Sequence, residues 1–262
     1  MTSKYEHIPD VELFDYWEKK QELRLVDEQI ELAIELIERD IEREYAIYLL
    51  GSNLSIQPDN HVAWCYLSMM LNDRLGCPYL ASIAANEAVK LKPGYAMALY
   101  YKDVANQSMM NRENNRNKLL SKRSEHKSVV SDATKPLSVL ASEFAAKLIN
   151  SGQQYEYALK LLDTALANNP HEPGAWLHLA KLLIDHYECS CLARLASEKA
   201  VAFNPGNAKS LYYMSCCLDD EEAIKVLDEA LVIDPEYEEA VRRKKTILYM
   251  LDRENEARAC RR

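Results

Sequence analysis

Small and apolar residues recur along the chain at the spacing of one face of a helix. Five segments share the pattern Ala-x3-Leu-x2-Ala-x4-Pro with small variations. Steps of four and three residues keep these side chains on one helical face, and small side chains there allow a neighbouring helix to approach closely. Proline ends each helix because it lacks an amide hydrogen and disfavours helical geometry in the residue before it. The five copies are Ala46, Leu50, Asn53, Pro58; Ala81, Ala85, Ala88, Pro93; Ala158, Leu162, Ala165, Pro170; Ala193, Ser197, Ala200, Pro205; and Ala223, Leu227, Ala230, Pro235.

Larger apolar residues follow these prolines at the same helical spacing. They form three sets: Trp64, Leu67, Leu71; Trp176, Leu179, Leu183; and Leu211, Met214, Leu218. A helix that carries such residues can fill the gaps that the alanines leave on its neighbour. The sequence therefore predicts a series of helix pairs and no sheet.

This arrangement resembles the tetratricopeptide repeat (TPR) family, whose unit is a 34-residue helix–turn–helix. The residues that match its motif are Trp64, Leu67, Ser68, Leu71, Ala81, Ala88, Pro93 and Trp176, Leu179, Ala180, Leu183, Ala193, Ala200, Pro205. The resemblance covers about 27–101 and 139–262, although the repeats at 61–93 and 173–205 each carry one extra residue between their helices. It implies an all-α, right-handed helical solenoid of about five to six helix pairs.

The sequence also repeats itself over a longer distance. A shift of 112 residues places 63–101 on 175–213 with 17 identities in 39 positions. Several of these identities, such as Asp73 with Asp185 and Cys77 with Cys189, are not motif positions. We therefore expect two related lobes whose backbones superpose.

Changes in composition divide the chain further. An acidic amphipathic helix is expected over 1–26, covering the first repeat, and the first lobe over 27–101. Residues 102–136 hold eight Lys or Arg and four acids; we expect a helix to Met110 and then a partly mobile basic connector. The second lobe is expected over 137–235 and a single capping helix over 236–262.

Overall composition narrows the class of protein. Hydrophobic residues make up 48%, while there are only 6 Gly and 9 Pro, which favours long helices over a turn-rich β fold. The net charge of −9 disfavours a surface that binds nucleic acid or anionic membrane throughout. No apolar stretch approaches the ~20 residues of a membrane span. Seven cysteines, an odd number, indicate a reduced, cytoplasmic chain rather than a disulfide framework.

Sequence patterns of catalysis are not found. There is no glycine-rich phosphate loop, nucleophile elbow or zincin motif. A metal site built from His178, His186, Cys189 and Cys191 is conceivable, but packed side chains are the commoner meaning of such a set. We therefore expect no enzyme, no cofactor and no metal.

The resemblance implies where a ligand would bind. In TPR proteins the first helices line a concave groove, at a position just after the Trp and one further turn on. In the first lobe this gives Tyr66, Met69, Asp73 and Tyr101; in the second it gives His178, Lys181, Asp185, Lys209 and Tyr213. The alternative for the tyrosine pairs 100–101 and 212–213 is that one member packs against the next helix.

Three functions remain open at this point. The leading one is a non-enzymatic adaptor or scaffold that holds a protein or peptide partner in its grooves. The second is a dedicated chaperone for a secretion or assembly client. The third is a nucleic-acid-associated protein that uses the basic residues of 112–127, although that stretch lacks interleaved aromatic residues.

Overall fold

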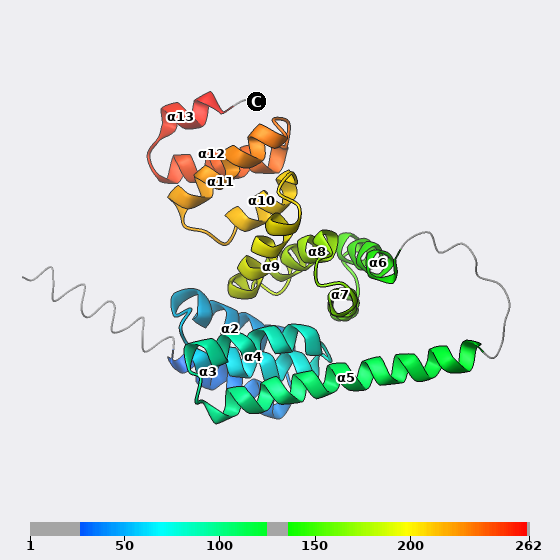
Figure 1. The fold of residues 1–262 in the computed structure, drawn as a ribbon. Helices are drawn as coiled ribbons and strands as arrows, with labels where there is room; N and C mark the ends of the chain where they lie inside the picture. The colour runs from blue at the N-terminus through cyan, green and yellow to red at the C-terminus, as the bar shows by residue number, and fades with distance from the viewer. Residues whose placement is uncertain (1–26, 125–135, 261–262) are drawn as a thin grey trace, which may run out of the picture.

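The chain folds as stacked pairs of helices. The computed structural model describes residues 27–124 and 136–260, and within these residues there is no strand (Figure 1). In the first lobe a helix over 27–39 precedes α2 (Arg43–Ile56), α3 (His61–Met69), the π-helical turn η1 (Met70–Arg74), α4 (Pro78–Leu91) and α5 (Ala96–Ser124). In the second lobe α6 (Leu137–Ser151), α7 (Tyr155–Asn168), α8 (Pro173–Asp185), α9 (Ser190–Phe203) and α10 (Ala208–Ser215) follow, with α11 (Asp220–Ile233), α12 (Glu238–Met250) and α13 (Glu254–Ala259) after them.

Each repeat is a first helix packed against a second helix. The pairs α3 and α4, α6 and α7, α8 and α9, and α10 and α11 are in contact, and the first helices α6, α8 and α10 also pack side by side. The repeated alanines lie at 0% exposure between the helices, as the spacing predicts. The expected all-α solenoid is confirmed.

The two lobes repeat each other in backbone detail. Helices α7 and α9 begin and end 112 residues after α2 and α4. The left-handed residues Asp40, Glu42 and Gly76 have counterparts with positive φ at 152, 154 and 188. In each lobe the Trp indole N–H donates to a proline carbonyl six residues earlier, Trp64 to Pro58 and Trp176 to Pro170. The offset seen in the sequence is therefore an offset in structure.

The extra residue in these two repeats is accommodated by a widened turn. The amide of Leu75 donates to the carbonyl of Met70, and the amide of Tyr187 donates to that of Leu182, which are both bonds to the fifth residue back. A turn of this kind holds one residue more than an ordinary helical turn. The departure from the 34-residue repeat thus has the same structural solution in both lobes.

The lobes pack against each other through their second helices. Contacts join α2 to α9 and α4 to α7, and one buried core cluster runs through both lobes. Under the 112-residue offset α2 corresponds to α7, and α4 corresponds to α9. The contact of α2 with α9 is therefore equivalent to the contact of α7 with α4. The lobes thus contact each other back to back, through the same pair of second helices in each. Sequence analysis did not predict this arrangement.

Equivalent positions on α2 and α7 carry different residues at this interface. Gly51 leaves room for α9, because a Cβ there would lie 2.8 Å from the Cα of Cys189. The equivalent residue of α7, Asp163, is fully buried; its Oδ1 accepts from the amide of Leu80 at 2.8 Å and its Oδ2 from Arg112 of α5 at 2.7 Å. The two halves of the interface therefore differ mainly in one buried carboxylate and its cation.

Helix α5 is longer than the sequence led us to expect. We predicted a helix only to Met110, but α5 continues to Ser124. Arg112 donates to Asp163 and to the carbonyl of Gly76, and Arg116 donates to the side chain of Asn168. These bonds hold the polar half of the helix against the second lobe, so the prediction of a mobile connector was wrong for 111–124. Residues 125–135 lie outside the described part of the chain.

Two of the segments expected from the sequence lie at the ends of the chain. Instead of one capping helix over 236–262 there are two, α12 and α13. They meet at Arg253, which pairs with Glu221 of α11 at 3.0 Å and with Glu256 at 2.7 Å. The helix expected over 1–26 lies outside the described residues.

Asp163 predicts a specific pH dependence of stability. Burial raises the pKa of its carboxyl from 3.8 to about 6, against the lowering by the Leu80 amide and Arg112. The folded state therefore keeps this proton to a higher pH than the unfolded chain does. The stabilisation of the folded state by the neutral carboxyl is full below about pH 4 and is lost as the pH rises to about 6. We expect the free energy of unfolding of Asp163→Asn, relative to the unsubstituted chain, to rise by roughly 3 kcal/mol across that window. Urea unfolding of both chains at several pH values measures this difference; parallel profiles would contradict it.

The tryptophans predict a stability effect. Trp176 is 2% exposed and Trp64 6%. Trp176→Ala should lower the free energy of unfolding by about 3–5 kcal/mol, because it leaves a cavity between α8 and its neighbours. Tyr249→Ala, at a side chain 50% exposed on α12, should change it by about 0.5 kcal/mol or less. If Trp176→Ala unfolds at the same urea concentration as the control, our placement of the core face is wrong.

Candidate functional site

The residues predicted to line the groove of the second lobe lie on α8 and α10, which are in contact. His178, Lys181 and Asp185 lie on one face of α8, at steps of three and four residues. Lys181 Nζ lies 2.6 Å from Asp185 Oδ2 and 6.0 Å from the ring centroid of Tyr213 on α10. The structure thus brings together the residues that the sequence assigned to this groove.

The charged residues predicted for this site are two lysines, of which Lys181 is paired, and one carboxylate. Burial lowers the pKa of His178, and the nearby cations Lys181 and Lys209 lower it further. Burial and the Asp185 carboxylate raise the pKa of the Tyr213 hydroxyl strongly, so it remains a neutral donor. Lys209 is exposed, and no carboxylate pairs with it in residues 27–124 and 136–260. The site therefore has one ammonium group, that of Lys209, without a carboxylate partner among the described residues.

The residues predicted to line the groove of the first lobe have a different character. Tyr66 and Met69 of α3, Asp73 of η1 and Tyr101 of α5 lie where α3 and α5 pack together. The hydroxyl of Tyr101 donates to the sulfur of Met69 at 2.7 Å. Burial raises the pKa of Tyr101, and Asp73 adds to that effect. This lining is aromatic, apolar and mildly acidic.

Neighbouring tyrosines in each groove differ in their packing. The rings of 100 and 101 are 5.2 Å apart and those of 212 and 213 are 5.1 Å apart, edge to face in both pairs. Tyr212 packs against Tyr237, with ring centroids 5.5 Å apart, whereas Tyr100 is 63% exposed. The alternative, that one tyrosine of a pair packs against the next helix, therefore holds for Tyr212 and does not hold for Tyr100.

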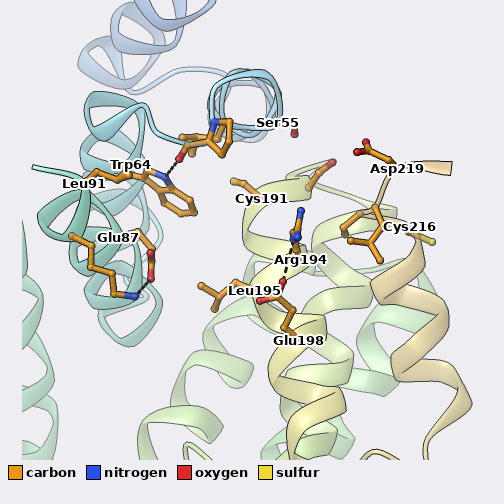
Figure 2. A pocket seen from close by; sticks show the side chains of 16 residues that line it. Ser55, Trp64, Glu87, Leu91, Cys191, Arg194, Leu195, Glu198, Cys216 and Asp219 are labelled. Carbon is orange, nitrogen blue, oxygen red and sulfur yellow. Dashed lines mark hydrogen bonds and ion pairs between the residues drawn. The ribbon is translucent and has the colours of Figure 1, made fainter. Parts of the chain in front are cut away.

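A concave feature lies between the lobes, and sequence reasoning missed it. Figure 2 shows Trp64, Glu87 and Leu91 of the first lobe across a hollow from α9 of the second. The hollow has a volume of about 800 Å³. Its walls come from helices more than a hundred residues apart, so no local pattern could reveal it.

Candidate chemistry in the structure is limited. The Sγ atoms of Cys189 and Cys191 are 3.6 Å apart, and all seven cysteines are free thiols. Across the described residues, no three His, Cys, Asp or Glu side chains are grouped so that they could hold a metal ion. No helix in this part of the chain is long and apolar enough to cross a membrane.

Comparison with known proteins gives matches to solved structures only. No family model and no curated protein matches the chain. One structural match is the first TPR domain of Spaghetti (RPAP3) bound to an HSP90 peptide, with 20% identity, a TM-score of 0.41 and coverage of 44% of this chain and 94% of that one. YrrB, a TPR protein with an unusual peptide-binding site, matches with 18% identity, a TM-score of 0.37 and coverage of 75% and 97%. A thermophilic TPR protein of Thermus thermophilus matches with 15% identity, a TM-score of 0.33 and coverage of 86% and 99%.

The repeated motif maps onto the helices of the structure. Five copies of the small-residue motif occupy second helices, each ended near its proline. The tryptophans of the matching first helices are buried. In its repeated motif and its paired helices, the chain resembles tetratricopeptide repeat proteins.

Proposed function

We propose that this protein is a non-enzymatic scaffold that holds protein partners in two grooves facing away from each other. The back-to-back packing of the lobes carries the proposal. Because the contacts between the lobes are made mainly by the second helices α2, α4, α7 and α9, the first helices α3, α8 and α10 are left available for ligands. Two ligand segments can then bind at once, which raises apparent affinity through effective concentration.

The two grooves should select different peptides. Because Lys181 is paired with Asp185, the excess positive charge of the second groove comes from Lys209, so this groove should favour an acidic segment with an apolar anchor for Tyr213. The first groove carries Asp73 beside Tyr66 and Tyr101, so it should favour a neutral or basic segment. Tyrosine suits both tasks because it offers a large apolar body and a polar tip with few rotors to order.

The nucleic-acid alternative is not favoured by the geometry. It needs the basic residues of the connector, but Arg112 and Arg116 are already bonded to the second lobe. The dedicated chaperone remains a variant of the same proposal, since a client segment would use the same grooves. We place the protein in the reducing cytoplasm because none of its cysteines is paired.

A double substitution tests the second groove. The partner is first obtained by co-purification with the full chain from its native source. Lys209→Ala with Tyr213→Ala should weaken binding of that partner by about 2 kcal/mol or more, roughly 30-fold in Kd, as truncation of interface anchors does. Isothermal titration calorimetry measures the loss. The matched control, Lys225→Ala with Tyr249→Ala, removes an exposed lysine and tyrosine outside the grooves and should bind normally.

A second variant separates binding from folding. Tyr213 packs partly against the core, so its loss can also lower stability. Lys209→Glu leaves the packing intact and should by itself weaken binding of an acidic partner. Normal binding by both groove variants, together with loss of binding on charge reversal at Arg116 and Lys118, would contradict the proposal and make α5 the functional surface.

A further inference from the structure

The cleft between the lobes runs along α4 and α9. These helices diverge, and two hollows of about 800 and 600 Å³ open between them. Both hollows are lined by Glu87, Lys90 and Leu195, so they join into one continuous channel. Figure 2 shows Leu195, Arg194 and Glu198 of α9 on the wall opposite Trp64 and Leu91.

The lining of this cleft combines apolar side chains with paired charges. Leu91, Leu195 and Leu218 supply apolar surface from both lobes. Glu87 bonds Lys90 at 2.6 Å, and Glu198 bonds Arg194 at 3.1 Å, so these four charges compensate each other. The cleft therefore needs an occupant that is partly apolar.

One end of the cleft is positively charged. Lys102 of α5 and Lys199 of α9 line the smaller hollow, and neither has a carboxylate partner in the described part of the chain. Asp219 lines only the larger hollow, at the other end. Two uncompensated ammonium groups beside the half-buried ring of Tyr79 are notable in a chain of net charge −9. Charge complementarity thus requires acids as well as apolar groups in the occupant.

We propose that this cleft binds the chain's own N-terminal segment, residues 5–18. That segment contains five acids and neither Lys nor Arg. It also contains four aromatic residues, Tyr5, Phe14, Tyr16 and Trp17. Its acidic and aromatic residues thus complement the lysines and the apolar side chains of the cleft. The cleft is a different site from the two grooves of the proposed function.

The position of residue 27 allows this contact. The helix over 27–39 and α2 are joined by a three-residue turn and share one core, so they run antiparallel. Residue 27 is consequently near the end of α2, where Leu54 and Pro58 line the cleft. The intervening residues 19–26 can span up to about 27 Å when extended. The first groove is a poor competitor because Asp73, and Glu38 near Tyr66, would repel an acidic segment.

Photo-crosslinking of the full chain tests the proposal. Trp17→p-benzoylphenylalanine is irradiated and the crosslinked peptides are mapped by mass spectrometry. The expected result is crosslinking within one chain to residues 78–93 or 190–203. A mixture of isotope-labelled and unlabelled chains distinguishes this from crosslinking between two copies. Crosslinks to α3 or to α8 and α10, crosslinks between copies, or no crosslink at all would overturn the proposal.

Charge reversal supplies the matched control. Lys102→Glu with Lys199→Glu, in the crosslinking chain, should lower the yield about three- to tenfold, because two attractive charges become repulsive. Lys181→Glu with Lys209→Glu makes the same change of charge in the second groove and should leave the yield unaltered. If a reversed chain melts early by circular dichroism, glutamine replaces glutamate at the same positions. An unchanged yield in the cleft variant, or a greater loss in the control, would also overturn the proposal.

Discussion

The close approach of second helices across the two lobes determines the shape of this protein. It depends on a missing side chain at Gly51, where a Cβ would meet the backbone of Cys189. At the equivalent place Asp163 occupies the interface instead, and a fully buried carboxylate must be hydrogen-bonded or paired. The amide of Leu80 and the guanidinium of Arg112 meet that need. Arg112 lies well along α5. This pair therefore accounts for the greater length of α5 compared with its counterpart in the second lobe, α10.

The helix pairs were predictable from sequence because they depend on local spacing. Alanines at steps of three and four, and tryptophans that face them, identify both helices of a repeat wherever they occur. Spacing also placed Lys181 and Asp185 on one face of α8, where they are found. The extra residue in two repeats was visible as a count, but its form as a widened turn was not.

The arrangement of the lobes could not be predicted in the same way. Its determinants are single residues far apart in the chain, such as Asp163 and Arg112, and neither belongs to a periodic pattern. Composition was misleading for α5, since an asparagine-dense, charged stretch has the appearance of a connector. Tertiary bonds from Arg112 and Arg116 outweigh this weak local preference. The cleft between the lobes could not be predicted either, because its lining residues are far apart in the chain.

Back-to-back packing distinguishes this arrangement from one continuous solenoid. Here second helices of both lobes are in contact, and residues of both lobes line a cleft. Equivalent positions on the two lobes can differ in charge, as Glu87 and its equivalent Lys199 do.

A double-mutant cycle between Arg112 and Asp163 tests the packing of the lobes most directly. The free energy of unfolding is measured for Arg112→Ala, Asp163→Asn and the double variant at about pH 7.5, where the carboxyl is ionised. Since the two side chains join α5 to α7, the structure predicts a coupling energy of about 1 kcal/mol or more. The control cycle of Lys102→Ala with Asp163→Asn should give almost none. Coupling below about 0.3 kcal/mol between Arg112 and Asp163 would contradict the back-to-back arrangement.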